Sequence, residues 1–269
     1  MPNLPMHIYL ADQVAKRLDW DWVNDHRGSL YLGSTAPDIR IMTKWPRERT
    51  HFAPLSADEV GTGTRQMFKL HPELENGNAA SDPTKAFLVG YISHLVADEA
   101  WISNVYRPNF DPPSGHCMVA RDEVEANLWD RALQLEMDRA AGDKMVGLLP
   151  GGEVLEDADL GVQVAFLEPG ALGEWREWVL RFLGWDLTWE RLKRALNRMY
   201  RDDENVQKVV DTFIEEMPAS MERIYEKISR DKIDAYRQRA LEDTLSQVQG
   251  RWGQLDRYPT DSSLPSECG

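Results

Sequence analysis

The sequence predicts an all-α protein that folds as a single-domain multi-helix bundle. Apolar residues recur at helical spacing along most of the chain, and no segment shows a convincing alternation of apolar and polar residues. A chain of 269 residues is long enough to form one large domain with a substantial core. We therefore assign residues 1–249 to one helical domain and residues 250–269, which have little apolar content, to a flexible C-terminal tail.

Helix signals divide the first half of the chain. Ser56 and Glu59 have the spacing of a capping box, and Asp82 followed by Pro83 is typical of a helix cap and first turn. The expected elements are a helix near residues 5 to 18, a turn-rich region at 25 to 55, a helix after Ser56, a central helix from Asp82 to about Asn104, and a loop at 105 to 118.

The second half continues the helical pattern. A helix is expected at about 119 to 140, because apolar residues there alternate with charged faces. Residues 147–170 contain Pro150-Gly151-Gly152 and an acidic patch, which favour a looser connector or a partly disordered lid. Three or so amphipathic helices should occupy 171–248 and pack as a bundle.

The central helix carries the most informative pair of side chains. His94 and Asp98 lie four residues apart inside an apolar run, so both point to one face of the helix. Such a pair is also common as a hydrogen-bonded core pair. Three upstream residues, His7, Asp38 and His51, favour a metal site, because imidazoles and carboxylates together suit zinc, with manganese or iron as other occupants.

The order of these residues resembles the zinc-dependent phospholipase C family, whose all-helical fold is shared with single-strand-specific nucleases. The resemblance rests on His7, Gly33 to Asp38, Thr50-His51-Phe52, and Gly90 to Asp98. It implies a cluster of up to three zinc ions that hydrolyses phosphodiesters. It also implies that Asp38, His51, His94 and Asp98 hold one zinc ion, and that His7 and Asp98 share a second.

The chain departs from the family pattern after Asp98. Asn104 stands where the family has a histidine, and Ala120 stands four residues after His116, where the family has a glutamate. His116 with a nearby acidic residue is the remaining candidate for an altered metal site. The first residues lack the features of a secretory signal, and the two cysteines are too few for a disulfide framework, so we expect a cytoplasmic protein.

These assignments predict a zinc-dependent hydrolase of a phosphoester, such as a phospholipid head group or a small phosphodiester. Asp38 is the candidate general base, and Trp101 and Asn104 are candidate substrate-binding residues on the ligand helix. Arg40, Arg47 and Arg49 are either surface charges or clamps for a phosphoryl oxygen, and the sequence favours the surface for at least two of them. The alternative is a catalytically altered helical protein that binds a metal or small ligand and retains only part of the zinc cluster.

Composition limits the partners. A formal net charge of −14 disfavours nucleic acid and anionic membrane surfaces, although bound zinc would reverse the local potential. Neutral lipids and small phosphoesters remain open as substrates, and no apolar run is long enough for a transmembrane segment. The chain has 10 tryptophans, and four of them, Trp175, Trp178, Trp185 and Trp189, either fill the core or line an apolar pocket.

Overall fold

The computed structural model describes residues 3–75, 80–111, 119–120, 122–145, 150–200 and 203–253, and within these ranges it contains helices and no strand. The predicted all-α fold class is confirmed. The elements up to the central helix are α1 (Leu4–Leu18), α2 (Asp21–Asp25), α3 (Arg27–Thr35), η1 (Ala36–Ile39), α4 (Arg40–Thr43), α5 (Arg47–His51), α6 (Thr62–Leu70), η2 (Pro72–Leu74) and α7 (Asp82–Trp101).

The remaining elements run from the end of α7 to the last described residues. The sequence predicted three or so helices after residue 170, and the structure has five there. The elements are η3 (Ile102–Tyr106), α8 (Arg107–Phe110), α9 (Glu123–Met145), η5 (Pro150–Leu155), α10 (Ala171–Leu183), α11 (Trp189–Met199), α12 (Glu204–Glu215), α13 (Ala219–Lys227) and α14 (Arg230–Trp252).

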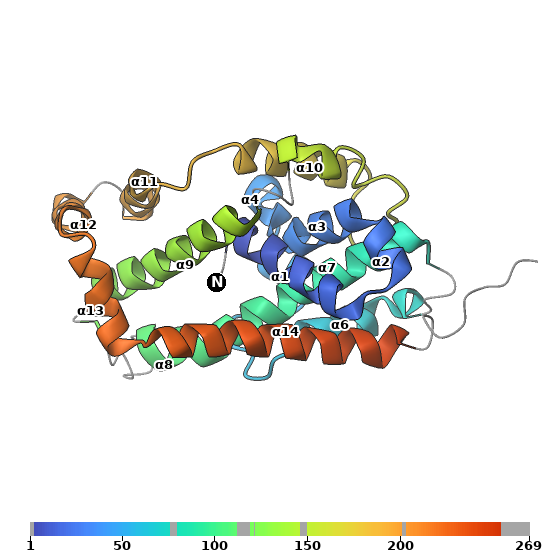
Figure 1. Ribbon diagram of the computed structural model, residues 1–269, viewed down its shortest axis with the longest axis horizontal. Coiled ribbons are helices and arrows are strands. Elements are labelled where there is room, and N and C mark those ends of the chain that lie inside the picture. Colours follow the sequence, from blue (N-terminus) through green and yellow to red (C-terminus); the bar gives the residue numbers. More distant parts are fainter. Residues whose placement is uncertain are drawn as a thin grey trace, which may run out of the picture.

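Helix α7 forms the centre of the fold. It is apolar on all sides, so it is stable only when other elements cover it. Helices α1, α3 and α14 pack directly against it, and Figure 1 shows α14 running lengthwise beside this central group. Helices α11, α12 and α13 lie at the opposite end of the molecule from α2 and α6 (Figure 1). They contribute to a second core that also includes α9.

Two glycines allow α3 and α7 to approach closely. A Cβ atom on Gly90 of α7 would lie 1.9 Å from the carbonyl oxygen of Leu30 in α3. A Cβ atom on Gly33 of α3 would lie 2.0 Å from the carbonyl oxygen of Phe87 in α7. Both obstacles are backbone atoms, so a larger side chain at either position would force the helices apart.

The predicted start of α7 at Asp82 is confirmed, but its predicted cap and the predicted helix start at Ser56 were wrong. The cap of α7 is Ser81 rather than Asp82, because the Ser81 hydroxyl accepts the hydrogen bond from the Thr84 amide at 3.3 Å. Ser56 caps no helix, because α6 begins six residues later, at Thr62. A distant carboxylate replaces the local cap there, since Glu99 of α7 accepts hydrogen bonds from the amides of Gly61 and Gly63.

The connector between α9 and α10 is packed over its described part. Ser29 donates a hydrogen bond to the carbonyl of Ala158 at 2.9 Å, and Leu155 is fully buried. Phe166 lies between Phe52 and Tyr91, with ring centroids 5.3 Å and 5.1 Å away. The predicted loose lid is therefore wrong for residues 150–170, because scattered apolar side chains anchor this segment to the core.

Helix α14 continues beyond residue 249, where the sequence placed the end of the domain. Trp252 is 1% exposed and packs edge-on against Trp22 and Phe68. The rest of the predicted tail, residues 254–269, lies outside the described residues, as do both cysteines, Cys117 and Cys268. In the part of the chain that the structure describes, no helix combines the length and apolar character needed to cross a membrane.

Replacing Gly90 with alanine is expected to destabilise the fold by about 3 kcal/mol, because the new methyl group would overlap the α3 backbone. Urea denaturation followed by circular dichroism measures the change in unfolding free energy. Gly142→Ala in α9 is the matched control, since no atom lies within 4 Å of its added Cβ. The control should gain about 1 kcal/mol from helix propensity. Equal stability of the two variants would contradict the close-packing argument.

Candidate metal centre

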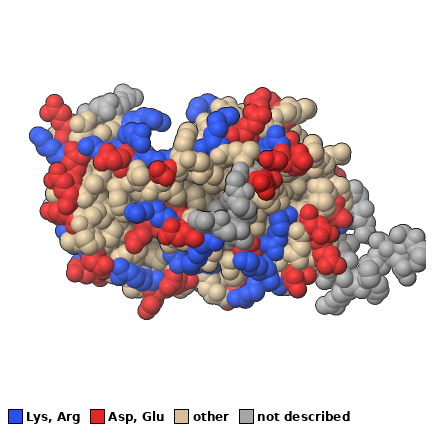
Figure 2. Space-filling model, turned by 45° about the horizontal axis from the view of Figure 1, so that its top comes forward, with Lys and Arg blue, Asp and Glu red and all other residues tan. Residues whose placement is uncertain are grey.

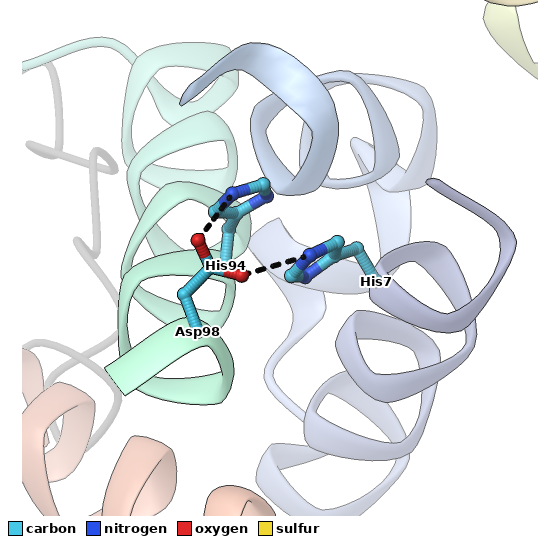
Figure 3. Close-up of side chains that lie close together, drawn as sticks. All are labelled: His7, His94 and Asp98. Atoms are coloured by element: carbon cyan, nitrogen blue, oxygen red, sulfur yellow. Dashed lines mark ion pairs between the residues drawn. The ribbon is translucent and has the colours of Figure 1, made fainter. Parts of the chain in front are cut away.

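Five predicted ligands converge between α1, η1, α5 and α7. His7 comes from α1, His51 from α5, and His94 and Asp98 from successive turns of α7, and all four are at most 1% exposed. Asp38 in η1 lies at the edge of the group with 18% of its side chain exposed. We call these five residues the His/Asp cluster. Figure 3 shows the Asp98 carboxylate paired with both His94 and His7, whose rings stack with their centroids 3.7 Å apart.

The Asp98 carboxylate lies at the centre of the cluster. Its Oδ1 atom is 3.4 Å from His7 Nε2. Its Oδ2 atom is 3.2 Å from His51 Nε2 and 3.7 Å from His94 Nε2. Asp38 approaches the same nitrogen of His51, with 3.9 Å between Asp38 Oδ1 and His51 Nε2. One buried carboxylate thus contacts imidazoles from three separate helices.

Hydrogen bonds outside the cluster orient two of the imidazoles. The Nδ1 atom of His94 is 2.8 Å from the carbonyl oxygen of Ser34, so this nitrogen carries the proton and donates. The Nδ1 atom of His51 is 3.1 Å from the hydroxyl of Thr50. Each ring therefore directs its Nε2 atom into the cluster. Fixing one ring nitrogen in this way leaves the other nitrogen free for a metal.

The cluster contains buried polar atoms that protein groups leave unsatisfied. Among the described residues, both ring nitrogens of His7, the Nε2 atoms of His51 and His94, and Oδ1 of Asp98 have no hydrogen-bond partner. Such atoms are rare in protein interiors, because leaving them unpaired costs free energy. Divalent cations would satisfy most of them, with each imidazole contributing one ring nitrogen.

The donor atoms are close enough to share an ion. One group of three is His7, His94 and Asp98, and the other is Asp38, His51 and His94. Within each group the ligand atoms lie within 4.8 Å of one another. Nitrogen and carboxylate oxygen donors in this combination suit zinc, so the residues fit the metal that the sequence predicted.

The electrostatics favour the protonation states that a metal requires. Burial alone would raise the pKa of the Asp98 carboxyl, but His94, His51 and His7 outweigh burial and hold that pKa well below its usual range. Burial and the neighbouring His7 lower the pKa of His94 well below its ordinary value. An ionised carboxylate beside a neutral imidazole is the state that binds divalent cations. Burial raises the pKa of Asp38 against the opposing charge of His51, and a bound cation would favour the ionised form.

Arg47 is part of the same site. Its Nη2 atom donates a hydrogen bond to Asp98 Oδ2 at 3.1 Å, and its side chain is 10% exposed. Its Nε and Nη1 atoms are buried without a hydrogen-bond partner among the described residues. Arg49, in contrast, pairs with Glu168 at 2.8 Å and lies over the Trp45 ring. The sequence left these arginines either as surface charges or as clamps for a phosphoryl oxygen. Arg49 is a surface charge, whereas the Arg47 side chain lies inside the site.

Two predicted substrate-binding residues, Trp101 and Asn104, follow Asp98 along the chain at the end of α7 and in η3. Trp101 is fully buried, donates from Nε1 to Asp130 Oδ1 at 3.0 Å, and packs edge-on against Tyr236. Asn104 lies in η3, a π-helical turn, and donates from Nδ2 to the carbonyl of Ala100 at 3.0 Å. Their assignment to substrate stays a prediction. The candidate ligand His116 lies outside the described residues.

The sequence missed the groups that orient the imidazoles. The Ser34 carbonyl is a backbone atom, so residue identity carried no signal for it. Thr50 could have been found from the sequence, because it directly precedes His51 and its hydroxyl is a hydrogen-bonding group that can orient the ring. Tyr91 supports this contact by donating to the Thr50 carbonyl.

The fold and the site define a helical protein with a buried His/Asp cluster suited to a divalent metal. Residues 6–101 match the family model described as zinc dependent phospholipase C, and this segment contains all five residues of the cluster. The match covers about a third of the chain and confirms the predicted resemblance over those residues. No curated protein and no solved structure matched the chain.

Replacing His94 with alanine is expected to remove bound zinc, because His94 belongs to both groups of three donors. Elemental mass spectrometry after dialysis against zinc measures the metal content of the wild-type and variant proteins. Zinc should also raise the melting temperature of the wild type but not of the variant. His26→Ala, which removes a histidine outside the cluster, should bind as much zinc as the wild type. Retention of zinc by the His94 variant would refute this site.

Proposed function

We propose that the protein is a metal-dependent hydrolase of phosphoesters, with a phospholipid head group or a small phosphodiester as its substrate. One juxtaposition carries the proposal: unsatisfied ligand atoms of the His/Asp cluster lie beside the unsatisfied donors of Arg47. The first set suits a cation and the second suits an anionic oxygen. A phosphoester bound through a metal provides both partners.

The residues of the chain have separable roles in this reaction. His7, His51, His94 and Asp98 would hold zinc, which acidifies water and polarises phosphoryl oxygens when it is bound. Asp38 is the most exposed member of the cluster and would accept the proton of the attacking water. The water oxygen bonds to phosphorus, the bond from phosphorus to the leaving oxygen breaks, and the leaving oxygen takes the proton that Asp38 accepted.

Arg47 would position the phosphoryl group. Its free Nε and Nη1 atoms are fixed donors in a site that is largely closed to solvent. Charge-assisted hydrogen bonds in such surroundings are stronger than those at the surface, because the local dielectric constant is low. This arrangement also provides the counter-charge that a phosphoester needs in a chain with a net charge of −14.

Replacing Asp38 with asparagine should lower kcat by about 10²- to 10⁴-fold, because the amide keeps the shape but cannot accept the proton. Turnover of a soluble short-chain phosphatidylcholine and of bis(p-nitrophenyl) phosphate by the zinc-loaded enzyme measures the effect. Asp25→Asn, at an exposed carboxylate outside the cluster, should leave kcat unchanged. Metal analysis of both variants separates loss of the base from loss of zinc. A fully active Asp38 variant would exclude this assignment.

Arg47→Gln should reduce kcat/KM by about 10- to 100-fold through loss of a charged hydrogen bond to the phosphoryl group. The same substrates measure the change. Arg49→Gln is the matched control, because Arg49 makes its ion pair with Glu168 at the surface. Equal effects of the two substitutions would argue against a phosphate-binding role for Arg47.

The alternative is a catalytically altered protein that binds a metal or small ligand without hydrolysis. Asn104 favours it, because this side chain replaces a family histidine and is engaged with the backbone of its own helix. Metal stoichiometry discriminates the two functions. Two or more zinc ions per chain with phosphoesterase activity support the hydrolase, whereas one ion or none without activity supports the altered protein.

A further inference from the structure

A groove lies between α4, the end of α10 and α11, and no residue of the His/Asp cluster lines it. Its volume is about 1050 Å³. Trp178 and Phe182 line one wall in a stack that begins at the buried Trp175. Trp185 continues this wall with its ring centroid 5.9 Å from that of Phe182. Of the four clustered tryptophans, Trp175 therefore fills the core, and Trp178 and Trp185 line the groove.

Helix α11 supplies the opposite wall with three arginines. Arg191, Arg194 and Arg198 are three and four residues apart, so they share one face over about 10 Å of helix. Within the described part of the chain, none of the three makes an ion pair with an acidic side chain, and Asp186 is the acidic residue among the lining side chains. A cationic strip of this kind is conspicuous in a protein with a net charge of −14.

Exposed apolar side chains border the same strip. Six large hydrophobic side chains are exposed among the described residues, and two of them lie here. Ile41 is 45% exposed and Trp185 is 54% exposed, and both line the groove. Figure 2 shows the molecule hollowed on the face turned forward, with Lys and Arg atoms beside the hollow.

We propose that this groove face docks on an anionic phospholipid surface. Tryptophan and aliphatic side chains enter the interfacial region of a bilayer, and arginines attract the negative lipid head groups. Salt screens charges beyond about 8 Å, so the local arginine strip governs contact rather than the net charge of the chain. The expectation that the acidic composition disfavours anionic membranes therefore does not extend to this face.

The chemistry of the groove favours a lipid surface over a nucleotide. A stacked base needs a free ring face, but the Arg191 guanidinium already lies over the rings of Phe182 and Trp185, at 4.8 Å and 5.0 Å. Ile41 offers no flat ring. Apolar side chains without a stacking surface are suited to acyl chains and the upper part of the bilayer.

The groove is linked to the candidate metal centre through neighbouring residues. Ile41 follows Asp38 in the chain by three residues. A smaller pocket of about 160 Å³ shares Phe182 and Arg191 with the groove and reaches Asp138. Asp138 accepts a hydrogen bond from the amide of Met6, the residue before His7. Docking here would hold the protein at a lipid surface, an advantage that rests on the proposed hydrolase function.

Co-sedimentation with vesicles tests the proposal without depending on catalysis. The full chain is mixed with vesicles of phosphatidylcholine alone or of phosphatidylcholine with phosphatidylglycerol. We expect binding to the anionic vesicles and weaker binding to the neutral ones. Each arginine near an anionic surface contributes about fivefold to partitioning, so the double variant Arg194→Gln, Arg198→Gln should bind about 30-fold more weakly. Trp185→Ser should also weaken binding.

Matched substitutions elsewhere provide the controls. Lys227→Gln with Arg239→Gln removes two exposed charges from α13 and α14, and Leu160→Ser removes an apolar side chain that is 62% exposed. Both controls should bind like the wild type. Absence of wild-type binding to anionic vesicles, or equal losses in the groove and control variants, would overturn the proposal. Binding of inorganic pyrophosphate or a short oligonucleotide through the same arginines, without vesicle binding, would identify a soluble ligand instead.

Hydrolysis of the soluble short-chain phosphatidylcholine separates this proposal from the proposed function. The arginine variants should retain that activity, because the groove is distinct from the His/Asp cluster. His94→Ala should lose activity but still bind anionic vesicles. Vesicle binding without any hydrolysis would leave the docking face intact and remove the hydrolase function.

Discussion

The buried carboxylate of Asp98 is the interaction on which the site depends. Imidazoles from α1, α5 and α7 and the guanidinium of Arg47 all approach its two oxygens. A buried carboxylate is costly unless charged or polar groups surround it. The helices that bring those groups together are therefore arranged around a single anionic centre, and an apolar core encloses them. A divalent cation would replace the incomplete pairing with direct coordination.

The same helical turn links this centre to the surrounding fold. Asp98 faces the imidazoles, while its neighbour Glu99 faces the start of α6 and binds its backbone amides. Adjacent residues on a helix point in different directions, so one turn serves two structural tasks. Close packing through Gly33 and Gly90 places α3 beside α7, and the Ser34 carbonyl then reaches His94. The close packing of α3 against α7 thus helps to set the orientation of the His94 ring.

The sequence predicted the helical class and the members of the cluster because both leave local patterns. The spacing of His94 and Asp98 on one apolar helix is such a pattern, and the order of His7, Asp38 and His51 added to it. Contacts between distant residues leave no local signal. The cap of α6 by Glu99, the packing of residues 150–170 and the burial of the Arg47 side chain all depend on tertiary structure. The predictions at Ser56 and in the connector failed for that reason, since local propensity was overridden by distant partners.

The π-helical turn η3 changes how the residues after Asp98 should be compared with a family pattern. A π-turn accommodates an extra residue, so it rotates every following side chain relative to a continuous α-helix. An offset counted along the sequence therefore ceases to specify an angle around the helix axis once the chain passes Trp101. Which side chain faces the cluster therefore depends on two things: the identity of residue 104, and how far η3 rotates that residue around the helix axis. Evolution can relocate a coordinating group at this point by altering the turn while leaving the ligand helix intact.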